Sequence, residues 1–378
     1  MYTKKQIQGL PAYAPGKPIE DVKREYNLET VVKMASNENP YGASSAVAKA
    51  ISAAAGETAL YPDGYGTELR QALALKHGVA EKQIILGNGS DEVIQFLCRA
   101  YLTSETNTVM ATPSFSQYKL NATIEGTTII EVPVKDDGSH DLDKMLGEIN
   151  ENTRIVWVCN PNNPNGVAID SDSFVAFLKR VPNDCLVVSD EAYFEYVEGE
   201  DFPDSIALME QFPQLVVLRT FSKAYGLAGL RIGYGIAQEP IAQAVDPVRP
   251  PFNNNVIGHT AALAALSDEE FIKICREKNG VEKAKLRNFF EELGMFVYPS
   301  ETNFLMIETG IPGNKLFQAF LEEGFILRSG EALGYPTGIR ISIGSAAEND
   351  AFLKVAPGII EQLSTKTSIE RKRQWWLE

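Results

Sequence analysis

Residues 215–231 read Leu215-Val216-Val217-Leu218-Arg219-Thr220-Phe221-Ser222-Lys223-Ala224-Tyr225-Gly226-Leu227-Ala228-Gly229-Leu230-Arg231. The apolar run at the start is typical of a buried strand, and the glycines near the end are typical of a tight turn. Lysine usually lies in solvent. Lys223, placed between a buried strand and a turn, is therefore a candidate for chemistry.

Two further apolar runs end in polar side chains of other kinds. The run 154–159 leads into Asn160-Pro161-Asn162-Asn163-Pro164-Asn165-Gly166, and the run 185–189 leads into Asp190-Glu191-Ala192-Tyr193. In open α/β sheets, ligands bind at the carboxyl ends of the strands. We therefore expect these loops and Lys223 to converge on one ligand.

The pattern around these runs indicates an α/β fold. Near-continuous apolar runs alternate with amphipathic segments, which predicts a mainly parallel sheet covered on both faces. The expected strands are 83–86, 108–111, 128–132, 154–159, 185–189, 215–218 and 232–236, and the expected helices include 91–102, 141–149 and 171–180. The last third, with helices at 281–293 and 314–323 and strands at 302–307 and 338–343, predicts a smaller α+β domain.

Composition limits the possible functions. The chain has 378 residues, 44% of them hydrophobic, and a formal net charge of −15, which opposes general binding to nucleic acid. No apolar run is long enough to cross a bilayer and the first residues lack the pattern of a signal peptide, so we expect a cytoplasmic protein without membrane contact. The four cysteines are expected to be buried thiols, and three histidines without ligand spacing predict no metal site.

Several motifs, taken together, identify the chain as resembling the fold-type I, class I/II aminotransferases. Within that group it is most similar to the histidinol-phosphate aminotransferase family, from about Leu10 to Leu363. The motifs are Ala35-Ser36-Asn37-Glu38-Asn39-Pro40, Tyr61-Pro62-Asp63, Leu86-Gly87-Asn88-Gly89-Ser90-Asp91-Glu92, residues 160–166, 190–193 and 219–231, and Ile339-Arg340-Ile341-Ser342-Ile343-Gly344.

The resemblance implies the architecture of a pyridoxal-5'-phosphate (PLP)-dependent transferase of fold type I. This comprises a three-layer αβα large domain at residues 37–270 and a small α+β domain at 1–36 and 271–365, in which the N-terminal segment forms a lid. It further implies a homodimer whose active sites are shared between subunits. Residues 366–378 lie beyond the resemblance, and we expect a frayed tail there.

The resemblance also assigns roles around the cofactor ring. Lys223 would hold PLP as a Schiff base and move a proton, Asp190 would pair with the pyridine nitrogen, and Asn160 and Tyr193 would bond the phenolic oxygen. Phe115 would stack on the ring. Ordinary structural roles remain open: a turn or N-cap for Asp190, an Asn-Pro turn for Asn160 and a core position for Phe115.

A second group would hold the phosphate. It comprises Gly89, Ser90 and Asp91 at the start of a helix, together with Ser222 and Arg231, and Tyr61 would reach the partner subunit's phosphate. An ordinary helix N-cap remains an alternative for Ser90. A dinucleotide-binding loop is disfavoured because Glu92 stands where the third glycine would be, and no lysine follows as in a P-loop.

The substrate residues implied by the resemblance are Arg340, Arg328, Tyr13 and Asn39, although structural roles are nearly as plausible for the last two. Two arginines suit a site that binds a phosphate-bearing amine and glutamate in turn. The implied reaction converts L-histidinol phosphate and 2-oxoglutarate into imidazole-acetol phosphate and L-glutamate, reversibly, in histidine biosynthesis.

Residues 329–336 depart from the glycine-rich form common in the family, which leaves specificity open. An aromatic amino-acid (Phe/Tyr) aminotransferase and a PLP-dependent phospho-amino-acid decarboxylase remain alternatives. A PLP-binding regulator is disfavoured because no DNA-binding segment precedes Leu10. A nicotinamide dehydrogenase is disfavoured by the broken glycine pattern.

Overall fold

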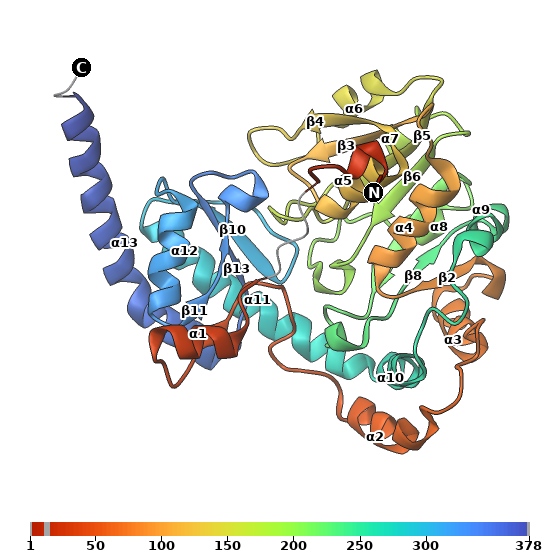
Figure 1. The fold of residues 1–378 in the computed structure, drawn as a ribbon, viewed down its shortest axis with the longest axis horizontal. Coiled ribbons are helices and arrows are strands. Elements are labelled where there is room, and N and C mark those ends of the chain that lie inside the picture. The colour runs from red at the N-terminus through yellow and green to blue at the C-terminus, as the bar shows by residue number, and fades with distance from the viewer. Residues whose placement is uncertain (1, 11–15, 376–378) are drawn as a thin grey trace. The chain divides into compact units, whose positions relative to one another are not determined.

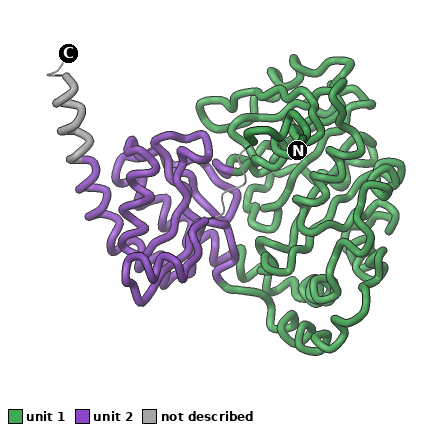
Figure 2. Tube along the Cα trace, in the orientation of Figure 1, with its two compact units in different colours: residues 1–12, 41–163, 167–276 green, residues 13–40, 164–166, 277–378 purple. Residues whose placement is uncertain are grey.

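A computed structural model describes residues 2–10 and 16–375 of the chain, with side chains as far as residue 364. The chain forms two compact units (Figure 2). Unit 1 comprises residues 1–12, 41–163 and 167–276, and unit 2 comprises 13–40, 164–166 and 277–378. Each unit is therefore assembled from segments that are far apart in the sequence.

A seven-stranded sheet forms the centre of unit 1 (Figure 1). Its strand order is β2-β8-β7-β6-β5-β3-β4, and only β8 runs antiparallel to its neighbours. The strands are β2 Ile84–Gly87, β3 Asn107–Thr112, β4 Thr128–Pro133, β5 Thr153–Cys159, β6 Leu186–Asp190, β7 Leu215–Thr220 and β8 Gly233–Ile236. All seven strands expected from the sequence are present, and the prediction of a mainly parallel sheet is confirmed.

The two faces of this sheet are buried against different helices. Successive side chains of a strand point to opposite faces. In β7, Val217 packs in the cluster that includes Leu73 of helix α3 (Thr67–His77), whereas Leu218 packs in the cluster that includes Phe96 of helix α4 (Ser90–Tyr101). Both faces are therefore covered, which explains why the strands are apolar at nearly every position.

Nine α-helices belong to unit 1 as far as the structure describes it, before the long helix α11. They are α2 Ser45–Ala54, α3 Thr67–His77, α4 Ser90–Tyr101, α5 Ser116–Glu125, α6 Leu142–Glu148, α7 Ser171–Leu178, α8 Ser205–Leu208, α9 Glu239–Val245 and α10 Val256–Leu266. The short 3-10 helices are η1 Lys5–Ile7, η2 Ala55–Glu57, η3 Glu81–Gln83, η4 Phe194–Tyr196, η5 Ala228–Leu230 and η6 Asp246–Val248.

Unit 2 contains a four-stranded antiparallel sheet of order β12-β13-β10-β9 and a parallel pair, β1-β11. The strands are β1 Val32–Lys33, β9 Phe296–Val297, β10 Phe304–Glu308, β11 Phe325–Ile326, β12 Arg328–Ser329 and β13 Gly338–Ser342. The helices are α1 Ile19–Tyr26, α12 Gly313–Glu322, η7 Glu331–Leu333, α13 Ala346–Trp375 and the part of α11 after Arg276.

Two helices differ from what the sequence predicted. Helix α11, Glu269–Glu292, begins twelve residues before the expected start at Val281. Asp268 accepts a hydrogen bond from the Phe271 backbone N–H and so caps the true start of the helix. Helix α13 continues to Trp375, through most of the segment expected to be frayed.

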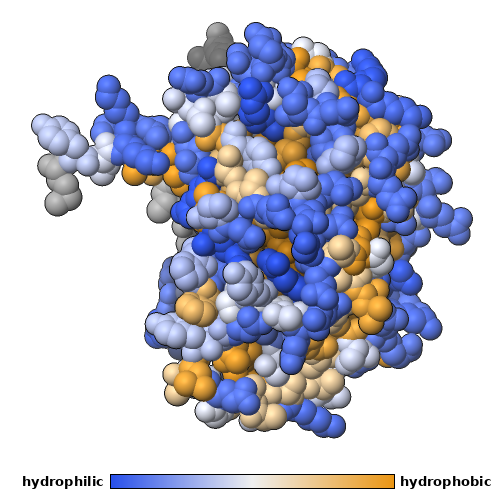
Figure 3. Space-filling view, turned by 90° about the vertical axis from the view of Figure 1, so that its right-hand side faces the viewer, coloured by the Kyte–Doolittle hydropathy of each residue, from blue (hydrophilic) through white to orange (hydrophobic). Residues whose placement is uncertain are grey.

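Charged and polar side chains dominate the face shown in Figure 3, where apolar residues form separate small patches. None of the helices in the described ranges is long and apolar enough to span a membrane. All four cysteines are buried free thiols, as expected. Among the described residues no cluster of His, Cys, Asp and Glu could hold a metal ion.

Candidate active site

Three neighbouring strands of unit 1 have predicted cofactor residues at or just after their carboxyl ends. Cys159 at the end of β5 lies opposite Asp190 in β6, and Asp190 lies opposite Leu218 in β7. The Asn160 N–H donates to the Asp190 carbonyl at 2.9 Å. The loops after these strands therefore begin side by side, as the sequence predicted.

Asp190 is a buried carboxylate without a cationic partner. Its Oδ2 accepts a hydrogen bond from the Tyr118 hydroxyl at 2.6 Å, and Oδ1 accepts from the Ala192 N–H at 3.2 Å. No lysine or arginine in the described part of the chain forms an ion pair with it. Burial raises the pKa of this carboxyl to about 6. A protonated ring nitrogen would supply the missing positive charge.

Tyr118 in α5 is a site residue that the sequence did not single out. Its ring stacks on Trp157 of β5, with centroids 4.8 Å apart and an angle of 10° between the planes. The Trp157 indole N–H donates to the Thr108 hydroxyl at 2.9 Å. Phe115 contacts the Tyr118 ring edge-on at 5.6 Å. Tyr118 and Asp190 are 72 positions apart, so no local pattern could have connected them.

The structure gives Asn160 a partner that follows it along the chain and gives Tyr193 a partner in the loop after β5. The Asn160 amide bonds Ile169 twice: Nδ2 donates to its carbonyl at 3.3 Å and Oδ1 accepts from its N–H at 2.8 Å. One Nδ2 hydrogen remains for a ligand. The Tyr193 hydroxyl accepts from Asn163 Nδ2 at 3.3 Å, and Lys223 Nζ lies 5.7 Å from the centre of the Tyr193 ring. Lys223, Tyr193 and Asn163 therefore lie together within unit 1.

A glycine-rich loop and Arg231 form a compact cradle between β2 and α4. Gly89 has φ +75°, and a side chain there would meet Arg231 Nη2 at 2.8 Å. A Cβ at Gly233 would lie 2.3 Å from the Ser90 nitrogen. Arg231 donates to the Asn88 carbonyl and to Asp91 Oδ2, both at 3.3 Å, and to the Ser222 hydroxyl at 3.4 Å.

The first turn of α4 opens directly into this cradle. No side chain of the preceding residue, Gly89, caps the helix. Backbone N–H groups at a helix start attract anions, and a guanidinium and a hydroxyl strengthen such a site. The residues predicted to bind phosphate, Gly89, Ser90, Asp91, Ser222 and Arg231, are thus brought together within unit 1.

Tyr61 differs from the other predicted cofactor residues in its exposure. Its side chain is 81% exposed and stacks on Phe252, with ring centroids 4.6 Å apart. A large exposed aromatic surface is typical of a region that contacts another protein.

The predicted substrate residues belong to unit 2. Arg328 in β12 lies directly opposite Arg340 in the antiparallel strand β13, so both side chains project from the same face. Like charges at opposed positions are unfavourable unless an anion neutralises them. Arg340 is buried and donates to the Ala35 carbonyl at 2.9 Å, and Asn39 is also buried. Tyr13 lies outside the described residues.

Comparison with known proteins assigns the family. The sequence profile of the family described as aminotransferase class I and II matches residues 29–355. The chain belongs to the class I and II aminotransferases. A relative from Shouchella clausii, named histidinol-phosphate aminotransferase, is 74% identical over 96% of this aminotransferase and 98% of its own chain. The Bacillus subtilis protein of that name is 50% identical, over 95% of this chain and all of its own.

Solved structures agree with the fold of this aminotransferase. The Sinorhizobium meliloti histidinol-phosphate aminotransferase, solved in complex with PLP, superimposes with a TM-score of 0.87 and 31% identity over 96% of this chain and 98% of its own. The L-threonine-O-3-phosphate decarboxylase from Porphyromonas gingivalis, at 24% identity over 88% of this chain and all of its own, has a TM-score of 0.76. A decarboxylase therefore shares the fold.

The described residues of the aminotransferase fit PLP. The cradle at Gly89 and Gly233 leaves no room for a side chain, and it presents helix N–H groups with Arg231 and Ser222 for the phosphate. Asp190 is a buried carboxyl held by Tyr118 and Ala192, and its ionised form would pair with a protonated pyridine nitrogen. The amine of Lys223 and the amide of Asn160 lie in the loops that follow the same group of strands.

Proposed function

We propose that this aminotransferase catalyses the reversible, PLP-dependent conversion of L-histidinol phosphate and 2-oxoglutarate into imidazole-acetol phosphate and L-glutamate, a step of histidine biosynthesis. The observation that carries the proposal is Asp190, a buried carboxylate held by Tyr118 and Ala192 without a cationic partner among the described residues. The names of the full-length relatives support the choice of substrate.

The side chains of unit 1 would each have one task. PLP, when bound, supplies a ring that accepts electrons from the substrate Cα. Asp190 accepts a hydrogen bond from the ring N–H and keeps that nitrogen protonated. Lys223 Nζ would take the proton from the Cα of the amino donor in the first half-reaction. In the second half-reaction it would give a proton to the Cα of the acceptor. Taking the proton needs an amine in its uncharged form.

Other groups hold the ring and the phosphate in place. Tyr193 and Asn160 hydrogen-bond the phenolic oxygen, and Phe115 packs on the ring face. The N–H groups of Gly89, Ser90 and Asp91 bind the phosphate together with Ser222 and Arg231. These contacts would fix the substrate Cα–H bond perpendicular to the ring, which orients it for proton removal.

Arg340 and Arg328 would recognise the anionic ends of the two substrates. A planar guanidinium binds a carboxylate or a phosphate through two parallel hydrogen bonds. The facing pair in β12 and β13 supports a site that accepts the phosphate of one substrate and a carboxylate of the other. Tyr13 would close over the substrate, and Asn39 would line the pocket.

We further propose that the enzyme acts in the cytoplasm as a homodimer, in which Tyr61 of each subunit reaches the cofactor phosphate of the other. The exposed aromatic pair Tyr61 and Phe252 supports a contact surface there. The acidic composition supports a protein without nucleic-acid or membrane partners.

Half-reaction kinetics with single amino donors would test the substrate. L-Histidinol phosphate, L-phenylalanine and L-threonine phosphate are each mixed with the holoenzyme, and the cofactor absorbance and released CO2 are recorded. We expect kcat/KM for histidinol phosphate to exceed that for phenylalanine by at least about tenfold, because only the former has a phosphate for the arginine pair. Release of CO2 from threonine phosphate, or faster turnover of phenylalanine, would contradict the proposal.

A further inference from the structure

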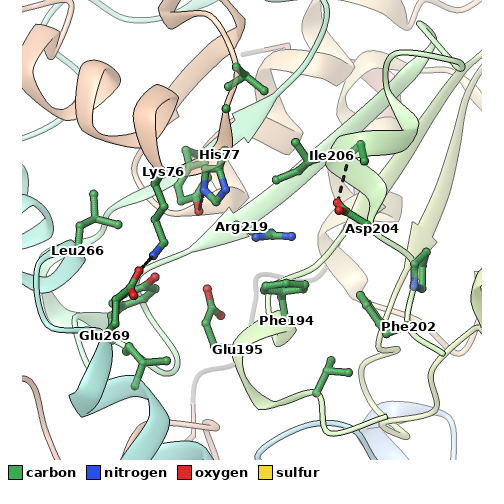
Figure 4. A pocket seen from close by; sticks show the side chains of 18 of the residues that line it. Lys76, His77, Phe194, Glu195, Phe202, Asp204, Ile206, Arg219, Leu266 and Glu269 are labelled. Atoms are coloured by element: carbon green, nitrogen blue, oxygen red, sulfur yellow. Dashed lines mark hydrogen bonds and ion pairs between the residues drawn. The ribbon is translucent and has the colours of Figure 1, made fainter. Parts of the chain in front are cut away.

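Unit 1 contains a second cluster of charged groups on the sheet face opposite to the Asp190 side chain. A cavity of about 1150 Å³ opens there between the end of α3, η4, α8, β7 and the start of α11 (Figure 4). Arg219 lines it from the sheet face on which Val217 packs, whereas Asp190 bonds Tyr118 in the cluster on the other face. The cavity is therefore distinct from the proposed cofactor site.

The cations that line the inner part of this cavity are already paired. Arg219 donates through Nε and Nη2 to Glu191 Oε2, at 3.1 and 2.9 Å, and its guanidinium lies 3.5 Å from the centre of the Phe194 ring. Lys76 Nζ pairs with Glu269 Oε1 at 2.8 Å. These contacts leave little positive charge there to attract an anion.

His77 is an uncharged member of the same cluster. Its Nε2 lies 2.9 Å from the Tyr234 hydroxyl, and burial lowers its pKa to about 3. The imidazole is therefore neutral at physiological pH and does not compensate an acid nearby.

The group of this cluster not yet described is the acidic side chain of Glu195. Its Oε2 is buried and accepts no hydrogen bond from any described residue, and Figure 4 shows the carboxyl group directed into the cavity. Burial raises the pKa of this carboxyl to about 7, partly opposed by Arg219 and Lys76. The other groups that face it are Glu191, Tyr225 and Tyr234. An unsatisfied buried acceptor is unfavourable until a donor reaches it.

We propose that this cavity is a binding site for a small organic cation with N–H donors, an ammonium or guanidinium compound, whose charged group pairs with Glu195. Five acidic and four basic side chains line the cavity, and Glu195 is the acid whose buried Oε2 has no donor among the described residues, which favours a ligand that brings a cationic N–H group. Phe194 and Phe202, with ring centroids 6.0 Å apart, offer an apolar surface for the rest of the molecule. The size of the cavity is ample for a ligand of this class.

The site would communicate with the proposed active site through the chain itself. Glu195 follows Tyr193 by two residues, and Arg219 lies in β7, four residues before Lys223 in the loop that follows this strand. A bound cation would change the charge balance around Arg219 and Glu191, and Glu191 adjoins Asp190. The binding site itself does not depend on the proposed reaction.

Methylguanidinium is a suitable probe because, unlike a primary amine, it does not condense with the cofactor aldehyde. Isothermal titration of the holoenzyme at constant ionic strength should give saturable binding near pH 8. The Glu195→Gln variant should bind at least about tenfold more weakly, because the charge-assisted hydrogen bond is lost. Glu105→Gln, the same change at an exposed acid outside the cavity, should leave the affinity unchanged.

A pH series on the unmodified protein tests the same point without mutation. With the Glu195 pKa at about 7, the ionised fraction falls between about pH 8 and about pH 5.5, and the apparent affinity should fall by more than about tenfold with it. Absence of saturable binding, equal affinity in Glu195→Gln, or affinity independent of pH would each overturn the proposal. None of these readouts requires the enzyme to turn over histidinol phosphate.

Discussion

Asp190 combines an unfavourable effect on the stability of the cofactor-free protein with a proposed role in the chemistry. Its folded pKa of about 6 lies above its ordinary value of 3.8, because burial penalises the charged form. Between about pH 4 and about pH 6 the folded protein therefore keeps a proton that the unfolded chain has lost. The stability contribution of this carboxyl is lost as the pH rises through about 6.

We therefore expect Asp190→Asn to stabilise the cofactor-free protein near pH 8 by about 1–3 kcal/mol, while it abolishes transamination. The amide keeps an acceptor for Tyr118 but removes the buried charge. Thermal unfolding at about pH 8 and about pH 4 measures the effect, which should vanish at the lower pH. A cofactor-free variant that is less stable at pH 8 would contradict this account of Asp190.

Tyr118→Phe should weaken PLP binding by about tenfold and move the acid limb of the kcat/KM profile to higher pH. The hydroxyl lowers the pKa of Asp190, so its loss raises that pKa further and leaves less ionised carboxylate at a given pH. Fluorescence titration of the cofactor-free protein gives the affinity. Tyr101→Phe, a change in the same core cluster away from Asp190, is the matched control.

Lys223→Ala should abolish transamination, because no other amine is proposed to move the Cα proton. Borohydride reduction followed by peptide mapping should no longer find PLP attached to the chain. Lys82→Ala, an exposed lysine at η3, should retain both properties. Attachment of PLP at another lysine would show that the proposed role of Lys223 is wrong.

At the scale of secondary structure, the sequence predicted the strands better than the contacts between them. Strands β5, β6 and β7 are apolar at nearly every position because helices cover both faces, and such runs are recognisable in a single sequence. The true start of α11 is marked by the cap at Asp268, which the predicted helix at 281–293 did not include. The close approach of Gly233 to Ser90 depends on tertiary packing, which no local pattern encodes.

The contact between β8 and the start of α4 can be tested by adding one methyl group. Gly233→Ala would place a Cβ 2.3 Å from the Ser90 nitrogen and so displace the first turn of α4. We expect PLP affinity to fall by at least about tenfold, because the phosphate loses aligned N–H donors. Gly229→Ala is the control, since a Cβ there meets no atom within 4 Å. An equal loss of PLP affinity in both variants would argue against the cradle as the phosphate-binding site.

At the scale of the whole molecule, the proposed dimer makes a prediction about mixed subunits. Tyr61→Ala and Lys223→Ala should each be nearly inactive alone. If Tyr61 acts across the interface, a heterodimer of the two contains one intact site, because the Lys223→Ala subunit provides Tyr61 to its partner. Random reassociation of equal amounts should then restore about one quarter of the normal activity.

The control for this experiment mixes Lys223→Ala with Asp190→Asn. Both residues serve the site of their own chain, so no heterodimer contains an intact site and no activity should return. Activity in this control mixture would exclude active sites shared between subunits. So would a lack of activity in the mixture of Tyr61→Ala with Lys223→Ala.

The pairing of β1 with β11 has a consequence for biosynthesis. Val32 lies next to Phe325 in a parallel pair, although about 290 positions separate them. A ribosome adding about 5–20 residues per second needs about 15 to 60 s to cover that interval. During this time the N-terminal strand has no partner and presents an unpaired edge to other nascent chains. Early shielding of residues 32–34 by a chaperone would therefore be expected to increase the yield of folded enzyme.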